Sequence, residues 1–212
     1  MERHRVGIVI PAFNEAATIG EVVAGASKYG IAIVIDDGSS DATALFARAE
    51  GASVAQHDTN YGYDRALNSG FILASKLGCE YVVTMDADGQ HDPIILPSFI
   101  NALENGADVV IGIRDRRQRV AEVIFAWISS LKWGIHDPLC GMKAYRIEVY
   151  KKLGHFDSYD SIGTELAIYA AKNNKRIVQL PIKTRKRVDE PRFFKKYSAN
   201  VLILRALWLA CV

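Results

Sequence analysis

The 212-residue sequence has only three cysteines, Cys79, Cys140 and Cys211, and their spacing matches no metal-ligand pattern. An odd number of cysteines argues against a disulfide framework and indicates a reducing compartment. No apolar run approaches the roughly 20 residues that a membrane-spanning helix needs. Residues 1–10 contain no apolar segment of the signal type. We therefore expect a cytoplasmic protein.

Two phosphate-binding signatures are also absent from the sequence. No G-x-G-x-x-G follows the first predicted strand, residues 6–10, and no G-x-x-x-x-G-K-[ST] occurs anywhere. A glycine-rich dinucleotide cradle and a P-loop are therefore excluded. A nucleotide held by carboxylates through a metal ion is the better interpretation.

Composition and charge describe a globular chain whose two halves differ. Half of the residues are apolar and 24% are charged, which suits one large domain, or one domain with an appendage. Residues 1–112 carry a net charge of −9 and residues 113–212 a net charge of +11. The acidic half suits cation binding, whereas the basic half suits phosphate groups or an anionic membrane surface. The alternative is that the charges of both halves only form solvated surfaces. We expect no nucleic-acid partner.

An acidic turn follows the most strand-like stretch of the chain. Residues 81–85 are apolar, β-branched or aromatic and predict a buried strand. Asp86, Asp88 and Asp92 follow it, with Pro93 placed to open a helix. Carboxylates crowded at the end of a buried strand repel one another unless a cation lies among them, and oxygen ligands suit Mg²⁺ or Mn²⁺. The alternative is an acidic turn satisfied by backbone N–H groups and water.

Strands alternate with helices over the first 113 residues. This pattern predicts an α/β fold with a mostly parallel central sheet flanked by helices on both faces. Asn14 is expected to cap the first helix, and Ser40 or Asp41 the second. Ligands of such sheets bind beyond the carboxyl ends of the strands. The polar residues at those ends are Glu15, Asp36, Asp37, Asp86, Asp88 and Arg114.

Several short motifs resemble the signature series of family 2 glycosyltransferases. They are P-A-F-N-E at 11–15, D-D-G-S at 36–39, N-x-G at 60–62 and D-A-D-G-Q-H at 86–91. The later D-P-L-C-G-M-K at 137–143 resembles the dolichyl-phosphate mannose synthase and polyprenyl-phosphate glycosyltransferase branch. The resemblance covers about residues 5–185 and implies the GT-A fold for residues 1–182. Residues 183–212 would form a basic loop and an apolar C-terminal helix.

The resemblance also implies roles for particular residues. A nucleoside-diphosphate sugar would be bound by Pro11, Phe13, Glu15, Asp37, Asp86 and Arg185. Mg²⁺ or Mn²⁺ would be held by Asp86, Asp88 and Gln90. Catalysis would involve Asp88, Arg114, Asp137 and Glu165, and Gly141 would help to shape the acceptor pocket. Asp37 has a second interpretation from its sequence context, that of a turn cap.

The implied reaction is an inverting, metal-dependent transfer of a sugar to a polyprenyl phosphate. A phosphate acceptor is already anionic and needs no strong base, whereas a saccharide hydroxyl, the alternative acceptor, would need Glu165 or Asp137 as base. A nucleotidyltransferase would carry a glycine-rich basic loop where residues 11–15 stand. A silent sugar-nucleotide-binding subunit is disfavoured because Asp86, Asp88 and Gln90 are retained.

Two segments of the basic half are apolar and contain tryptophan. Basic residues at 114–119 precede a predicted helix at 120–133, which has Val120, Trp127 and Leu131 on one face. Residues 197–212 are apolar on most sides and follow another basic run. Such helices suit an interfacial position on the inner face of the cell membrane. Core packing or a homo-oligomer interface is the alternative.

Overall fold

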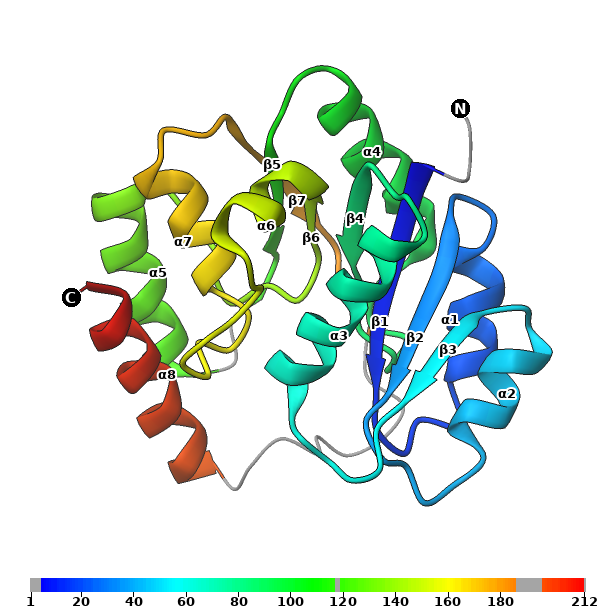
Figure 1. The fold of residues 1–212 in the computed structure, drawn as a ribbon. Coiled ribbons are helices and arrows are strands. Elements are labelled where there is room, and N and C mark those ends of the chain that lie inside the picture. The colour runs from blue at the N-terminus through cyan, green and yellow to red at the C-terminus, as the bar shows by residue number, and fades with distance from the viewer. Residues whose placement is uncertain (1–4, 117–118, 186–195, 212) are drawn as a thin grey trace.

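The structure is a computed structural model that describes residues 5–116, 119–185 and 196–211. Its centre is a seven-stranded sheet in the order β3-β2-β1-β4-β6-β5-β7 (Figure 1). The strands are β1 (Val6–Ala12), β2 (Ile31–Asp36), β3 (Ser53–Gln56), β4 (Tyr81–Thr84), β5 (Val109–Arg114), β6 (Lys143–Arg146) and β7 (Ile177–Ile182). The helices are α1 (Ile19–Ala26), α2 (Thr43–Ala49), α3 (Tyr63–Lys76), α4 (Leu96–Glu104), α5 (Val120–Trp133), α6 (Ile147–Leu153), α7 (Glu165–Lys172) and α8 (Lys196–Cys211).

The expected α/β architecture with a mostly parallel sheet is confirmed. β1 pairs in parallel with β2 and β4, β2 with β3, and β5 with β7. β6 is the exception, because it lies between β4 and β5 and runs antiparallel to both. The sequence pattern predicted five strands, and β6 and β7 were not among them.

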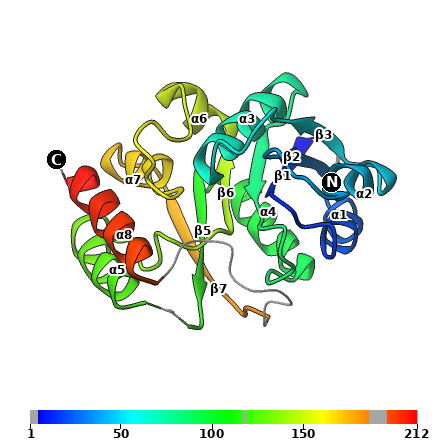
Figure 2. The same ribbon diagram turned by 90° about the horizontal axis from the view of Figure 1, so that it is seen from below.

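Helices cover both faces of the sheet (Figure 2). On β1, Ile8 and Ile10 belong to the apolar core under α1 and α4, whereas Val9 belongs to the core under α3. Successive side chains of a strand point to opposite faces, so a strand buried on both sides is apolar throughout. The polar residues are thereby confined to the ends of the strands.

Asn14 does not cap the first helix, contrary to the expectation from the sequence. α1 begins at Ile19 after Thr18, and Asn14 instead has a positive φ of 55°. Its side-chain oxygen accepts a hydrogen bond from the Ser40 N–H at 2.8 Å. Asn14 therefore joins the loop after β1 to the loop after β2. It does not cap α1, because it lies before the residue that precedes that helix. Asp41, the other expected cap, accepts the Thr43 N–H at the start of α2.

The C-terminal helix α8 packs against α5 at the side of the sheet that carries β7 (Figures 1 and 2). Ile203, Ala206, Leu207 and Ala210 of α8 are buried in the same apolar core as Phe125 of α5. Within the described ranges, no helix combines the length and hydropathy required to span a bilayer. Most of the predicted basic loop, residues 186–195, lies outside the described residues, as does Val212.

Candidate active site

A cavity of about 1070 Å³ opens beyond the carboxyl ends of β1, β2, β4 and β5. Every site residue expected from the sequence lines it, except Asp137 and Glu165. The lining residues with these expected roles are Pro11, Phe13, Glu15, Asp37, Asp86, Asp88, Gln90, Arg114, Gly141 and Arg185. The sheet thus brings residues as far apart in the sequence as Pro11 and Arg185 to one opening.

Asp37 holds the loop that forms one wall of the cavity. Its carboxylate accepts hydrogen bonds from the backbone N–H groups of Tyr61 and Gly62 at 3.0 and 2.8 Å. The same carboxylate lies 2.6 Å from Nδ1 of His57. Asp37 therefore has the turn-holding role that its sequence context allowed. The implied contact with a nucleoside base remains a prediction.

The loop after β1 is tied to the loop after β4, which carries Asp86 and Asp88, and to the start of α2. The Thr18 hydroxyl donates to the carbonyl of Ala87 at 2.8 Å, and the Glu15 N–H donates to the hydroxyl of Thr43. Glu15 is buried, whereas the Phe13 ring is exposed at the mouth of the cavity. An exposed aromatic ring beside a polar pocket can stack on a planar base.

The acidic loop extends from the end of β4. Asp86 Oδ1 accepts the Tyr63 hydroxyl at 3.3 Å, and Asp88 Oδ1 accepts the Gln90 N–H at 3.0 Å. Burial raises the pKa of Tyr63, and the charge of Asp86 raises it further, so the phenol stays a hydrogen-bond donor. A Cβ atom on Gly141 would lie 2.3 Å from the Asp86 carboxylate. Only glycine allows this backbone to approach Asp86 so closely.

The residues of the acidic loop fit a hard divalent cation. Asp86, Asp88 and Gln90 offer two carboxylates and an amide oxygen within five consecutive residues, all lining the cavity. The Asp86 side chain is 31% exposed. Mg²⁺ and Mn²⁺ prefer such oxygen ligands and keep further positions for phosphate oxygens or water. The three residues expected to hold the metal therefore line one cavity, and their role as ligands stays a prediction.

Arg114 and Asp137 form a buried ion pair beside the cavity. The Arg114 guanidinium donates to both carboxylate oxygens of Asp137 at 2.9 Å, and the Arg114 backbone N–H donates to the same group at 3.0 Å. Arg114 also contacts Glu122 at 3.3 Å, and Glu122 pairs with Arg119. Burial alone would lower the pKa of Arg114, but the hydrogen bonds and charge of Asp137 raise it above its usual value. The Asp137 carboxylate is therefore occupied by its ion pair with Arg114.

Glu165 lies away from the cavity, at the first turn of α7. Its carboxylate accepts the Ser158 N–H at 2.6 Å and the Ser158 hydroxyl at 2.8 Å. It also lies 2.9 Å from Nε2 of His155. These contacts hold the loop before α7 against the helix, so the location gives no support to a role as general base.

Arg185 follows β7 and lies alongside the acidic loop. Its backbone N–H donates to the Gln90 carbonyl at 2.9 Å, and its guanidinium pairs with Asp92. Half of its side chain is exposed. Arg185 is thus held beside the loop that carries Asp88, and its contact with a diphosphate stays a prediction.

Lys143, at the start of β6, lines the cavity although we assigned it no role from the sequence. The residue is 3% exposed, and its ammonium donates to the carbonyl of Cys140 at 2.6 Å. The only signal that could have identified Lys143 is its position as the last residue of the D-P-L-C-G-M-K motif. Its burial depends on β6, which was not expected.

A second acidic group lies at the first turn of α3, and none of its residues lines this cavity. Ligand atoms of Asp64, Asp157 and Asp160 lie within 4.8 Å of one another. Asp64 accepts the N–H groups of Ile162 and Gly163 at 3.0 and 2.6 Å. Burial, followed by the charge of Asp157, nevertheless raises the pKa of Asp64 to about 7.

The raised pKa of Asp64 predicts that stability falls as the pH rises. Because the pKa in the folded state lies above the unfolded value of 3.8, protonation favours folding, and this contribution is lost between about pH 4 and pH 7. The loss is on the order of 4 kcal/mol. We expect the melting temperature to fall by several degrees between pH 5 and pH 8, and to fall less in Asp64→Asn. Equal pH slopes for both proteins would contradict this assignment.

Comparison with known proteins identifies the family. The model of "Glycosyl transferase family 2" matches residues 7–154. A dolichyl-phosphate hexose transferase of Haloferax volcanii is 30% identical, with 98% of this chain and 94% of that protein covered. A polyprenol monophosphomannose synthase of Mycolicibacterium smegmatis is also 30% identical, with 84% of this chain and 76% of the relative covered.

A solved structure has the same fold. Glucosyl-3-phosphoglycerate synthase from Mycobacterium tuberculosis, in complex with Mn²⁺, uridine diphosphate and phosphoglyceric acid, superposes with a TM-score of 0.77. It is 23% identical, and the match covers 97% of this chain and 78% of that one. The family match and this superposition confirm the expected GT-A fold. The chain is a glycosyltransferase that belongs to glycosyltransferase family 2.

Proposed function

We propose that this glycosyltransferase moves a sugar from a nucleoside diphosphate to a polyprenyl phosphate, with inversion at the anomeric carbon. One observation carries the choice of acceptor. Neither carboxylate expected to act as base is available, because Asp137 is paired with Arg114 and Glu165 lies outside the cavity. A phosphate acceptor is already an anionic nucleophile and needs no such base. A saccharide hydroxyl would need one.

The donor end of the reaction is supported by the acidic loop. Asp86, Asp88 and Gln90 would hold Mg²⁺ or Mn²⁺ against the diphosphate, as the chemistry of these ligands suggests. When bound, the cation neutralises the negative charge that the leaving nucleoside diphosphate gains. Arg185, held beside the acidic loop, adds a positive charge at the same place. The solved neighbour of the same fold was crystallised with Mn²⁺ and uridine diphosphate, which supports a divalent cation and a nucleoside diphosphate as ligands here.

The acceptor end of the cavity combines basic and apolar side chains. Arg116 and Arg119 lie on the loop that leads into α5, and both line the cavity. The lining also includes the apolar residues Leu139, Ile162, Ala199, Leu202 and Ile203. A phosphate attached to a hydrocarbon chain matches this combination, because the headgroup meets cations while the first isoprene units meet apolar side chains. The relatives named as transferases of dolichyl or polyprenyl phosphate support this interpretation.

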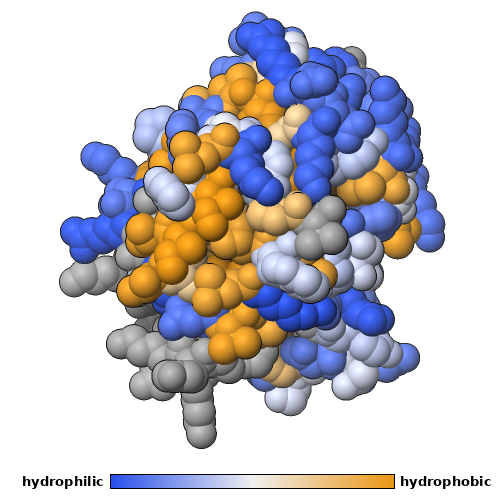
Figure 3. All heavy atoms as spheres, turned by 90° about the vertical axis from the view of Figure 1, so that its left-hand side faces the viewer, coloured by the Kyte–Doolittle hydropathy of each residue, from blue (hydrophilic) through white to orange (hydrophobic). Residues whose placement is uncertain are grey.

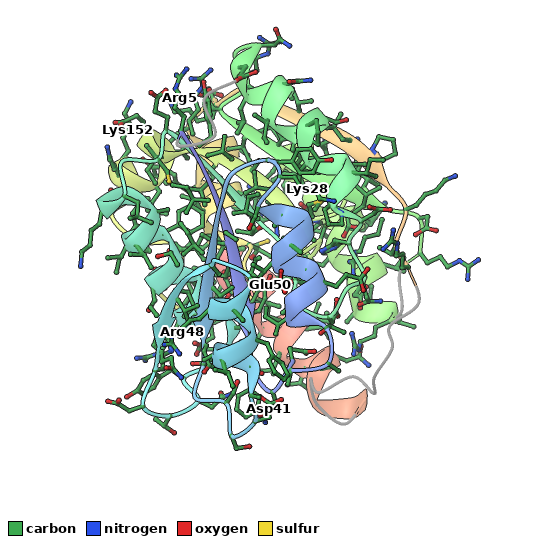
Figure 4. All side chains as sticks on the ribbon, turned by 90° about the vertical axis from the view of Figure 1, so that its right-hand side faces the viewer. Arg5, Lys28, Asp41, Arg48, Glu50 and Lys152 are labelled. Atoms are coloured by element: carbon green, nitrogen blue, oxygen red, sulfur yellow. The ribbon has the colours of Figure 1, made fainter. Side chains whose placement is uncertain are left out.

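An exposed apolar surface beside this end supports docking on a membrane. Figure 3 shows the surface extending across α5 and α8. Trp127 and Trp208 are each 65% exposed, and the other exposed members are Val120, Val123, Ile124, Leu131, Val201 and Leu204. The opposite side of the molecule presents charged side chains, among them Lys28, Arg48 and Glu50 (Figure 4). The surface would therefore face the inner leaflet, with the acceptor entering beside it.

The function is tested by product analysis. The purified protein is incubated with a panel of nucleoside-diphosphate sugars, Mn²⁺ and a short-chain polyprenyl phosphate, and the products are identified by mass spectrometry. We expect one glycosyl polyprenyl phosphate and the matching nucleoside diphosphate. Transfer to an added oligosaccharide with none to the lipid would overturn the proposed acceptor and favour the saccharide alternative.

Membrane docking predicts binding to anionic vesicles through the two tryptophans. Trp127→Ser together with Trp208→Ser should reduce sedimentation with vesicles that contain anionic lipid by roughly tenfold or more, since both rings leave the interface. Leu45→Ser with Phe46→Ser is the matched control, because both residues are exposed on α2 at the opposite side of the molecule.

Salt separates the electrostatic from the apolar part of this binding. Each basic residue near an anionic surface contributes about 1 kcal/mol, so binding of the unaltered protein should weaken as salt is raised. Equal sedimentation of the tryptophan variant and the unaltered protein would contradict docking through α5 and α8. A concentration-dependent dimer that the same tryptophan variant abolishes would assign the surface to a homo-oligomer instead.

A further inference from the structure

Lys143 is, at 3% exposure, the least exposed of the charged residues that line the cavity. Among the described residues its ammonium has a single hydrogen-bond acceptor, the Cys140 carbonyl at 2.6 Å. No described carboxylate comes within ion-pair distance of it. An ammonium carries three donors, and a buried one is costly unless they are satisfied. Two donors are therefore left for a group that enters the cavity.

The nearby carboxylates do not fill this role. Asp137 is occupied by three donors of Arg114, so it is already neutralised. Asp86 is held against the backbone of Gly141 and accepts the Tyr63 hydroxyl. Burial lowers the pKa of Lys143, and the charges of Asp137 and Asp86 offset this only in part. An incoming anion would complete the surroundings of the ammonium.

The backbone holds Lys143 in a fixed position relative to the acidic loop. The Lys143 N–H donates to the Thr84 hydroxyl at 3.1 Å, and that hydroxyl donates to the Gly141 carbonyl at 2.7 Å. Thr84 is the last residue of β4, two residues before Asp86. The ammonium and the acidic loop are therefore attached to the same pair of strands, so the cation is in place before a ligand arrives.

We propose that the Lys143 ammonium donates hydrogen bonds to a phosphate oxygen of the substrate at the floor of the cavity. The inference rests on the proposed function, which brings two phosphate sources into this cavity. One source is the diphosphate of the donor, and the other is the phosphate of the acceptor lipid. Lys143 is on this basis a substrate-binding residue in addition to those expected from the family resemblance.

The test compares Lys143→Met, which keeps the length of the side chain without its charge, with Lys143→Arg. Isothermal titration measures binding of uridine diphosphate and guanosine diphosphate in Mn²⁺, and binding of uridine and guanosine. If Lys143 binds the donor diphosphate, Kd for the nucleoside diphosphate should rise roughly 10- to 100-fold in Lys143→Met. Kd for the nucleoside should stay the same, and Lys143→Arg should restore part of the loss. Lys151→Met, at an exposed position on α6, is the matched control.

If Lys143 binds the acceptor phosphate, nucleoside diphosphate affinity is unchanged and KM for the short-chain polyprenyl phosphate rises by a similar factor. A purely structural lysine would lower the melting temperature of Lys143→Met without changing either constant, and that result overturns the inference. Failure of the unaltered protein to bind any nucleoside diphosphate in Mn²⁺ would instead overturn the proposed function. The two failures are therefore distinguishable.

Discussion

Asp88→Asn is expected to reduce Mn²⁺-dependent turnover on the order of 10²- to 10³-fold, the range seen when one charge-stabilising group is removed from an active site. The substitution keeps the shape of the side chain but takes a negative charge from the proposed cation site. Its Oδ1 contact with the Gln90 N–H can be made by an asparagine oxygen, so the fold should be retained. The measurements are initial rates with Mn²⁺ or Mg²⁺ and circular dichroism of both proteins.

Asp58→Asn provides the matched control, because Asp58 is an exposed carboxylate that does not line the cavity. Its rate should equal that of the unaltered protein. A second readout is Mn²⁺-dependent binding of uridine diphosphate or guanosine diphosphate, which Asp88→Asn should weaken and Asp58→Asn should leave unchanged. Full turnover of Asp88→Asn, or of the unaltered protein in excess chelator, would refute the metal assignment.

Asp137→Asn is expected to cost roughly 3–5 kcal/mol of unfolding free energy, because it leaves the buried guanidinium of Arg114 with only the longer contact to Glu122 as a counter-charge. For a protein of this size the fall in melting temperature is on the order of 10 °C. The Asp137 side chain is only 2% exposed, so water cannot replace the lost carboxylate. Thermal denaturation followed by circular dichroism measures the effect.

Glu148→Gln is the matched control for Asp137→Asn. It breaks the exposed pair between Glu148 and Lys151 and should change the melting temperature little, since solvent screens both charges.

The double substitution Arg114→Met with Asp137→Leu tests whether the loss of stability comes from the unpaired charge. Replacing both partners of a buried pair by apolar groups removes the unpaired charge and should recover most of the stability. It should not recover activity if Arg114 also serves the acceptor phosphate. A melting temperature of Asp137→Asn equal to that of Glu148→Gln would contradict the importance of the buried pair.

Much of the site was predictable because local pattern and topology agree. The run at residues 81–85 is apolar and β-branched, so it predicts a buried strand whatever surrounds it. In a parallel sheet the carboxyl ends of such strands meet at one edge, and this brings Glu15, Asp37 and Asp88 to one cavity. Pro93 marks the following helix turn, and the structure has a 3₁₀ turn there before α4, with the Asp92 side chain accepting the Ile94 N–H.

The residues that the sequence did not predict correctly depend on contacts between distant segments. β6 is only four residues long and begins and ends with a basic residue, so no strand period is visible in it. Its position is determined by pairing with β4 and β5. For Asp37 the local sequence left two roles open; the N–H groups of Tyr61 and Gly62 confirm the turn-holding role, and the contact with a base stays a prediction. Asn14 was expected to cap a helix, but its contact with the Ser40 N–H joins two loops instead.

The central position of β6 determines the order in which the protein can assemble during synthesis. Strands β1 to β4 can pair as soon as residue 84 has been made, but β4 then remains an edge strand until residues 143–146 arrive. That edge is Tyr-Val-Val-Thr, an apolar segment with unpaired N–H and C=O groups, which is prone to pair with other chains. Roughly 60 residues must be synthesised in this state, so early formation of α4 over the sheet would protect the nascent chain from aggregation.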